Sequence, residues 1–291
     1  MPRVMVIVQT VSDLDNHLAE LKANGFRIGF IPTMGALHPG HLSLIKRAMM
    51  ENDRVVCSIF INPTQFNDIK DLQQYPRMPE ADLQLLDQAG CHVVFLPEVK
   101  EIYKAGESLL NIDLGLLETT MEGFYRPGHF NGVATVVHKL FTMVKPDAAY
   151  FGEKDFQQLA VIRRMTQIMG HKTVIVGCTT LRESDGLAMS SRNLLLTREQ
   201  RSAAPLIYKI ISGAGELLKQ NNFSKVKEWV IDTINYNPHL KVQYFEIVDP
   251  VSLVALADDE RFKECRACIA VLTSGPRLID NTAYLADDGL H

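Results

Sequence analysis

The chain has 291 residues, of which 46% are hydrophobic and 22% charged, and its formal net charge is −4. This composition is ordinary for a globular enzyme with a sizeable core, and the length suits one large domain or two modest ones. A negative net charge without a long basic run argues against nucleic-acid binding. No apolar stretch reaches the length of a bilayer, so we expect no membrane-spanning segment and no membrane partner.

The N-terminal segment and the cysteines bear on localisation. Residues 1–11 are apolar but lack the residue order of a signal peptide, so they predict an opening strand. The five cysteines are an odd number scattered through predicted core elements, which indicates a reducing compartment, the cytoplasm. Cys265 and Cys268 form a lone C-x-x-C, but residues three apart in a strand point to opposite faces. We therefore expect no metal or redox site there.

Strand and helix patterns alternate over the first 180 residues. Ser12 and Asp15 resemble a capping box for a helix that carries Leu14, Leu18 and Leu21 and ends at Gly25. Residues 98–129 look irregular, and their end (122–130) suits either a mobile loop near a ligand or a plain crossover loop. We expect strands at 28–31, 54–61, 91–96, 147–151 and 172–178, and further helices around 42–49, 80–88, 133–144 and 159–169. This alternation predicts a parallel sheet with right-handed crossovers.

The pattern changes after about residue 180. Residues 182–193 form a polar loop with Gly and Ser, and helices are expected near 197–219 and 224–235. Three strand-like runs follow, at 242–248, 265–272 and 277–285, and the turns between them suit a small antiparallel sheet. We therefore predict an α/β fold with two domains. Residues 1–180 form a Rossmann-like, doubly wound parallel-sheet domain, and residues 181–291 form a smaller α+β lid domain.

The stretch Phe30–His41 is the most informative in the chain. An apolar strand runs into a turn that holds Gly35 and two histidines, His38 and His41, and an amphipathic helix follows at once. Pro39 suits the first turn of that helix, and His38 falls at or near its N-cap. The helix N-terminus suits a phosphate, and two imidazoles can follow charge along a polyphosphate. Two surface histidines in a loop are the structural alternative.

Three more polar clusters follow predicted strands or open the second domain. Asn62 and Gln65 offer amides that suit the hydroxyls and carboxylate of a small substrate, although a capping Asn and a surface Gln are equally compatible with the pattern. The stretch 152–158 has Lys154 beside a helix N-terminus, Asp155 to cap the helix or meet a ribose, and Gln158 one turn later. An ordinary capped helix is its alternative. The stretch 182–193 offers two hydroxyls and an arginine to phosphate oxygens, or is a plain linker. Neither a Walker loop nor a G-x-G-x-x-G motif occurs.

These clusters, in this order, resemble a known family. His-x-Gly-His is typical of the nucleotidyltransferases related to class I aminoacyl-tRNA synthetases. The longer stretches resemble the pantoate–β-alanine ligase (pantothenate synthetase) family. They are PTMGALHPGH (32–41), SIFINPTQF (58–66), RPGHFNG (126–132), FGEKDFQQLAVIR (151–163), DGLAMSSRN (185–193) and RLIDN (277–281). The stretch DGLAMSSRN occupies the place of the superfamily's Lys-Met-Ser-Lys-Ser loop.

The resemblance implies a ligation of pantoate with β-alanine through a pantoyl adenylate, with ATP as substrate and Mg²⁺ as its partner. It implies that His41, His38 and Lys154 are catalytic, His41 being the proton donor to the leaving group. Gln65 and Gln158 would bind pantoate, and Gln65 would also meet β-alanine. Mg²⁺ would be held mainly by the ATP phosphates and water. The implied ATP-binding residues are Met34, Gly35, Ala36, Leu37, His38, Pro39, Gly40, His41, Gly152, Glu153, Lys154, Asp155, Leu181, Met189, Ser190, Ser191 and Arg192.

A homodimer is a further expectation from the resemblance. Two rival interpretations stay open at this point. One is a related nucleotidyltransferase that acts on a phosphorylated acceptor, such as a cytidylyltransferase or pantetheine-phosphate adenylyltransferase. Such enzymes need a cationic acceptor pocket, whereas the second cluster offers the amides of Asn62 and Gln65. The other rival is a non-catalytic nucleotide-binding regulator that kept the fold.

Overall fold

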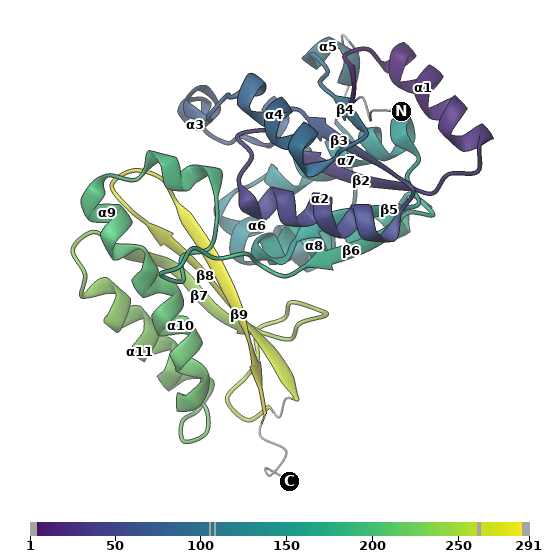
Figure 1. The fold of residues 1–291 in the computed structure, drawn as a ribbon. Helices are drawn as coiled ribbons and strands as arrows, with labels where there is room; N and C mark the ends of the chain where they lie inside the picture. Colours follow the sequence, from purple (N-terminus) through teal and green to yellow (C-terminus); the bar gives the residue numbers. More distant parts are fainter. Residues whose placement is uncertain (1–4, 105, 108, 261–262, 287–291) are drawn as a thin grey trace. The chain divides into compact units, whose positions relative to one another are not determined.

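The computed structural model describes residues 5–104, 106–107, 109–260 and 263–286, and it divides into two compact units (Figure 1). The first unit comprises the described residues up to Glu153 together with Gln158–Thr179. The second comprises Lys154–Gln157 and the described residues from Thr180 onward. The short segment 154–157 therefore belongs with the second unit, although it is embedded in the sequence of the first.

A six-stranded parallel sheet forms the centre of the first unit, in the order β1-β4-β3-β2-β5-β6. β2 and β5 pair directly, with Phe30 opposite Ala149. From β2 the chain adds β3 and β4 on one side, and from β5 it adds β6 on the other. The carboxyl ends of β2 and β5 therefore mark the point where a doubly wound sheet binds its ligand. The predicted Rossmann-like fold is confirmed. The strands are β1 (Val6–Val8), β2 (Ile28–Thr33), β3 (Arg54–Ile59), β4 (Val93–Phe95), β5 (Ala148–Gly152) and β6 (Val174–Cys178).

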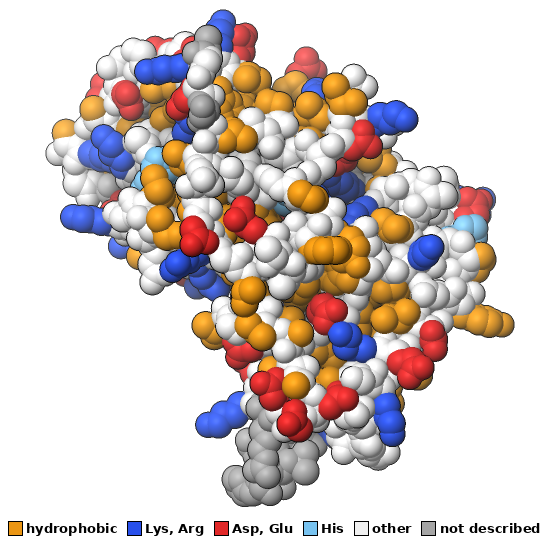
Figure 2. All heavy atoms as spheres, turned by 180° about the vertical axis from the view of Figure 1, so that it is seen from behind, with side chains coloured by type: hydrophobic (Ala, Val, Ile, Leu, Met, Phe, Trp, Pro, Cys, Tyr) orange, Lys and Arg blue, Asp and Glu red, His pale blue; other side chains and the backbone are white. Residues whose placement is uncertain are grey.

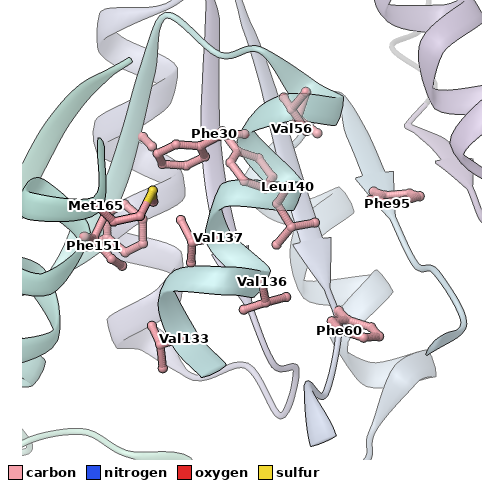
Figure 3. Close-up of a cluster of buried hydrophobic side chains, with 14 of the residues drawn as sticks. Phe30, Val56, Phe60, Phe95, Val133, Val136, Val137, Leu140, Phe151 and Met165 are labelled. Atoms are coloured by element: carbon pink, nitrogen blue, oxygen red, sulfur yellow. The ribbon is translucent and has the colours of Figure 1, made fainter. Parts of the chain in front are cut away.

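Helices cover both faces of this sheet, which explains why its strands read as continuous apolar runs. Successive strand residues point to opposite faces: Phe30 lies in one core cluster and Ile31 in the other. The first cluster is built on α1 (Val11–Ala23), α7 (His129–Val144) and α8 (Phe156–Ile168) (Figure 3). The second is built on α2 (Pro39–Glu51) and α4 (Pro79–Ala89).

Several local expectations for the first unit need correction. The predicted capping box at Ser12 is wrong, because α1 begins at Val11 and the Thr10 hydroxyl caps it by accepting from the Asp13 amide at 3.1 Å. α7 begins at His129, earlier than expected, after Gly128 in the left-handed region. The stretch expected to be irregular contains short helices, which the sequence did not predict because one or two helical turns leave no periodic pattern. The short helices inside and outside this stretch are η1 (Pro63–Gln65), α3 (Ile69–Gln74), α5 (Val99–Ile102), η2 (Gly115–Glu118), α6 (Met121–Tyr125) and η3 (Glu153–Asp155), the last shared between the two units.

The second unit packs helices on a three-stranded antiparallel sheet of order β7-β8-β9. The predicted helix at 197–219 is divided, because Pro205 lacks the N–H that a continuous helix would need and begins a new helix instead. Cys265 and Cys268 lie buried in β8, as expected for strand residues. The elements are η4 (Ser191–Leu195), α9 (Arg198–Ala203), α10 (Pro205–Leu217), α11 (Phe223–Asn235), β7 (Lys241–Val248), β8 (Glu264–Leu272) and β9 (Leu278–Leu285).

Acidic and basic side chains are interspersed on the face shown in Figure 2. Within the described ranges, every helix is too short or too polar to cross a membrane. The same ranges contain no group of three His, Cys, Asp or Glu side chains arranged to hold a metal ion.

A half-buried histidine pair makes the stability of the first unit sensitive to pH. His138 Nδ1 and His171 Nε2 lie 2.9 Å apart, and His171 packs edge-on against Phe141. Burial lowers the pKa of both imidazoles below the ordinary 6.5; the charge of Lys139 lowers that of His138 further, and His138 does the same to His171. At pH values near and below 6.5, the folded protein thus binds fewer protons on these two imidazoles than the unfolded chain does. The resulting stability is complete above about pH 6.5 and is lost as the pH falls through the lowered pKa values.

We expect the free energy of unfolding to fall between pH 7 and pH 5, and to fall less steeply in His171→Gln. The substitution removes one imidazole that must be protonated on unfolding and leaves a neutral amide beside His138. Urea unfolding of both proteins at half-unit pH intervals measures how steeply each free energy of unfolding changes with pH. The difference between the two free energies of unfolding at pH 8 gives the cost of the substitution itself. Parallel pH profiles for the two proteins would contradict this assignment.

Candidate active site

The turn between β2 and α2 has an unusual backbone that a residue from α4 stabilises. Gly35 and Ala36 both adopt positive φ values, +80° and +50°. Asp82, only 2% exposed, accepts hydrogen bonds from the amides of Ala36 (2.9 Å) and Leu37 (2.7 Å) through its two carboxylate oxygens. A Cβ atom on Gly35 would lie 2.9 Å from the same carboxylate, so this position requires glycine. Asp82 therefore fixes the path of the chain into the histidine pair.

The two histidines cap the helix that they open. His38 is the N-cap residue and Pro39 is the first helical residue, as predicted. The Nδ1 atom of His38 accepts from the Gly40 amide at 3.2 Å, and the Nδ1 atom of His41 accepts from the His38 amide at 3.3 Å. The rings lie 4.0 Å apart between centroids, and both side chains are half-buried. An imidazole whose Nδ1 accepts a backbone N–H carries its own proton on Nε2 when neutral. Capping thus selects the tautomer in which each ring has an Nε2–H donor.

The second cluster lies after β3, in the same unit. Gln65 is 9% exposed, and its Nε2 atom lies 3.0 Å from the sulfur of Met34. Asn62 donates from Nδ2 to the Gln65 Oε1 atom at 3.2 Å, which orients the amide of Gln65. Asn62 also caps η1, accepting from the Thr64 amide at 3.3 Å. The capping role considered for Asn62 is correct, but Gln65 is not a surface residue. The structure brings Gln65 and Met34 together.

The sequence stretch 126–132 supports this cluster from α7. His129, 6% exposed, places Nδ1 at 2.8 Å from the Gln65 carbonyl oxygen and Nε2 at 3.0 Å from an Arg126 nitrogen. A Cβ atom on Gly132 would lie 2.5 Å from the Thr64 carbonyl oxygen, so only glycine allows α7 to approach η1 this closely. The end of the stretch expected to be irregular is therefore an ordered support for Gln65.

The third cluster follows β5, and the division into two units runs through it. Gly152 ends β5, and Glu153 is the last residue of the first unit before Lys154. The Lys154 side chain is 18% exposed and lies 3.5 Å from a carboxylate oxygen of Asp155. Gln158 is half-buried on α8 in the first unit, the unit that also contains Gln65. Among the predicted phosphate-binding residues, His38 and His41 therefore belong to the first unit and Lys154 to the second.

The fourth cluster is a compact turn in the second unit. The Met189 amide donates to the Leu181 carbonyl at 3.0 Å, and Ser190 caps η4 by accepting from the Arg192 amide at 3.3 Å. Ser191 is 7% exposed, whereas the Leu181 side chain is 40% exposed. The Arg201 guanidinium stabilises the start of this turn by forming ion pairs with Glu183 and Asp185. These bonds order a stretch that the sequence presents as a flexible polar loop.

An arginine links this turn to β9. Arg182 forms a bidentate pair with Asp280, with distances of 2.7 and 2.9 Å, and Asp280 is 5% exposed. The guanidinium also stacks over the ring of Tyr208 at 3.3 Å and donates to the Gly186 carbonyl at 3.1 Å. The RLIDN stretch, which the sequence analysis singled out without a role, thus anchors the turn that leads to Met189–Arg192.

Comparison with known proteins decides the family. The family model described as pantoate-beta-alanine ligase matches residues 6–283. The chain belongs to the pantoate–β-alanine ligase family. A curated relative, the pantothenate synthetase of Porphyromonas gingivalis, is 51% identical over 280 residues, covering 96% of this chain and 99% of the relative. The family match spans every candidate site residue named above.

Solved structures of the same family share the fold. The pantothenate synthetase of Thermus thermophilus is 41% identical, with a TM-score of 0.89 over 96% of this chain and 99% of that one. The pantoate-beta-alanine ligase of Francisella tularensis, solved with beta-gamma ATP and beta-alanine, is 38% identical, with a TM-score of 0.82 over 96% and 97% of the two chains. The sequence resemblance to pantoate–β-alanine ligases is confirmed.

The sequence did not predict the supporting roles of three residues. Asp82, His129 and Asn281 each bond the backbone of a predicted site residue or its neighbour, and each acts from a distant part of the chain. Asp82 had a detectable signal, because a carboxylate one turn before Leu86 lies on the apolar side of α4. His129 and Asn281 lay within quoted family stretches, but nothing local indicates what they contact.

Proposed function

We propose that this chain catalyses the ATP-dependent condensation of (R)-pantoate with β-alanine to pantothenate. In the first step a pantoate carboxylate oxygen attacks the α-phosphorus of ATP, the bond from that phosphorus to the β-phosphate oxygen breaks, and pyrophosphate leaves. In the second step the β-alanine amine attacks the acyl carbon of pantoyl adenylate, the bond to AMP breaks, and the amine loses a proton. Adenylation replaces a poor leaving group, the carboxylate oxygen, with AMP.

The observation that carries this proposal is the capped histidine pair after β2. Both imidazoles use Nδ1 as an acceptor for the helix backbone, so each neutral ring carries its proton on Nε2, the atom that we assign to donate to the triphosphate. Charge moves onto the leaving pyrophosphate during adenylation, and fixed donors that meet this charge lower the barrier. We assign His38 and His41 to the triphosphate, with His41 as proton donor to the leaving group.

The remaining ATP contacts follow the order of the clusters. Met34–His41 forms one wall of the nucleotide site, and Gly152–Asp155 holds ribose and phosphate. Lys154 stabilises the negative charge that accumulates in the transition state. Leu181 contacts adenine through its backbone, and Met189, Ser190, Ser191 and Arg192 close over the phosphates. Closure of the second domain, residues 181–291, would shield the adenylate from water.

Mg²⁺ fits this site as a partner of ATP rather than as a resident of the protein. Most residues assigned to the phosphates carry imidazole, ammonium or guanidinium groups, which are poor ligands for Mg²⁺ because this ion prefers oxygen. The carboxylates in the assigned stretches are Glu153 and Asp155, and Asp155 pairs with Lys154 at 3.5 Å. The ion would therefore be bound mainly by phosphate oxygens and water, where it neutralises charge on the triphosphate.

Isotope exchange between pyrophosphate and ATP, without β-alanine, tests the proposal. Exchange that requires pantoate is the expected result, because it demonstrates both the adenylate step and its substrate. Exchange that requires a phosphorylated acceptor instead would favour the related nucleotidyltransferases. Tight ATP binding without turnover, in folded protein supplied with Mg²⁺, would favour a regulator.

Pantoate recognition is assigned to Gln65 and Gln158, and Gln65 also meets β-alanine. We expect Gln158→Ala to raise the KM for pantoate by at least about 10-fold, on the scale of one lost substrate hydrogen bond, and to leave the KM for ATP within about 2-fold. Gln167→Ala, at an exposed position on the same helix, is the matched control. Equal weakening of ATP and pantoate would remove Gln158 from the pantoate site.

We also propose that the protein is located in the cytoplasm and that it forms a homodimer. The dimer rests on the family, and exposed apolar side chains on η2 and α6 of the first unit are candidates for its interface. Leu116, Phe124 and Tyr125 are 57%, 61% and 40% exposed there. Sedimentation equilibrium should give a mass twice that of the 32.7 kDa chain, and a monomer at micromolar concentration would contradict the dimer.

A further inference from the structure

The strand β9 contacts the short segment that carries Lys154. Asn281, 4% exposed, donates from Nδ2 to the Lys154 carbonyl oxygen at 2.9 Å, although the two residues are 127 positions apart. The Oδ1 atom of Asn281 accepts from Arg266 on β8 at 3.2 Å. The guanidinium of Arg266 in turn lies 4.3 Å from the ring centroid of Phe156. Two side chains of one hairpin thus hold the segment at residues 154 and 156.

Asn281 is itself fixed in place. The backbone amide of Asn281 donates to the Asp280 carboxylate at 2.8 Å, and its backbone carbonyl oxygen accepts from Arg182 at 3.3 Å. Asp280 also forms the bidentate pair with Arg182 that anchors the turn before Met189. A hydrogen bond to a peptide carbonyl restrains the plane of that peptide, and the plane after Lys154 contains the Cα atom from which the lysine side chain leaves the backbone. The grouping of residues 154–157 with the second unit agrees with this attachment.

We propose that Asn281 is a positioning residue for Lys154, holding the lysine backbone on the β8–β9 hairpin so that its ammonium group is placed by the second unit. The inference rests on the proposed function, since it takes Lys154 to be the group that stabilises charge on the phosphates. This proposal assigns the RLIDN stretch (277–281) a supporting role in the adenylation step. Asn281 acts through Lys154 and touches no reacting atom.

The substitution Asn281→Asp tests this with the smallest change of shape. It keeps an oxygen for Arg266 and puts an oxygen in place of the amide nitrogen that faces the Lys154 carbonyl. We expect kcat for pantoate-dependent pyrophosphate exchange to fall at least about 10-fold, because small displacements of a charge stabiliser are costly, and the KM for pantoate to change less than about 2-fold. Thr282→Ala, at the next position of β9, is the matched control and should exchange at the normal rate.

A double-substitution cycle separates positioning from general damage. Lys154→Ala should lower exchange by more than about 100-fold, and adding Asn281→Asp should lower it no further, because the residue through which Asn281 acts is already absent. Multiplied losses, or normal exchange in Asn281→Asp, would overturn the inference. Asn281→Ala removes the donor without adding a buried charge and completes the same cycle if the aspartate variant does not fold.

The cycle also separates this inference from the proposed function. Lys154→Ala by itself reports on the role of the lysine, and pantoate-dependent exchange in the unaltered protein reports on the reaction. Normal exchange in Lys154→Ala would overturn both the role of the lysine and the positioning by Asn281, while leaving the reaction in place. A slow Lys154→Ala with multiplied losses in the double variant would overturn the positioning by Asn281 only.

Discussion

Replacing His41 with alanine is expected to lower pantoate-dependent pyrophosphate exchange by more than about 100-fold, the usual scale for the loss of one preorganised donor. The side chain has two separable tasks, since Nδ1 accepts from the His38 amide at 3.3 Å and Nε2–H is assigned to the leaving pyrophosphate. Rapid-quench measurement of single-turnover adenylation gives the effect on the chemical step itself.

Two conservative variants separate those tasks. The asparagine in His41→Asn has a polar atom at the place of Nδ1 and can still cap the helix, whereas the glutamine in His41→Gln reaches the place of Nε2. We expect the glutamine variant to retain more adenylation activity and the asparagine variant to retain more stability toward urea. A faster asparagine variant would show that the main contribution of His41 is structural, and near-normal turnover in His41→Ala would remove it from the catalytic set.

The β2–α2 region shows what local sequence can predict. The strand, the glycine turn, Pro39 at the first helical position and His38 at the N-cap were all predicted, because each depends on residues within one turn of the chain. The same reasoning misplaced the cap of α1, since Thr10 followed by Asp13 satisfies the capping pattern as well as Ser12 followed by Asp15. Competition between two valid caps depends on where the helix packs, which local pattern does not contain.

The supports of the site depend on distant contacts and were not predictable in this way. The bond from Asn281 to Lys154 joins residues 127 positions apart, and the bond from His129 to Gln65 joins residues 64 apart. Family resemblance identified the residues assigned to substrates, but it gave no account of how their backbones are held. The assignment of Lys154–Gln157 to the second unit likewise depends on contacts with β8 and β9, so sequence order placed these residues in the first domain.

Removing the Asp82 carboxylate is expected to damage both the fold of the first unit and its chemistry. Asp82→Ala removes the carboxylate that accepts from the buried amide of Ala36 and the half-buried amide of Leu37, and a buried donor that loses a partner costs about 1–3 kcal/mol. We expect the free energy of unfolding to fall by about 3 kcal/mol, and pantoate-dependent exchange to fall at least about 100-fold, because the turn before His38 and His41 loses its support. Urea unfolding and exchange kinetics measure the two effects.

Glu80→Ala separates a loss of the bonds to this turn from a loss of charge on α4. Glu80 is an exposed carboxylate in the first turn of the same helix, so its removal changes the helix charge in the same way and leaves the turn after β2 untouched. We expect normal exchange in Glu80→Ala. Asp82→Asn keeps one acceptor oxygen but turns an amide N–H₂ toward the second backbone N–H, and should lie between Asp82→Ala and the unaltered protein in both measurements. If Asp82→Ala lost stability but exchanged normally in its folded fraction, the carboxylate would support the fold without placing the histidines. Loss of exchange in the fully folded fraction is the result that joins α4 to the chemistry after β2.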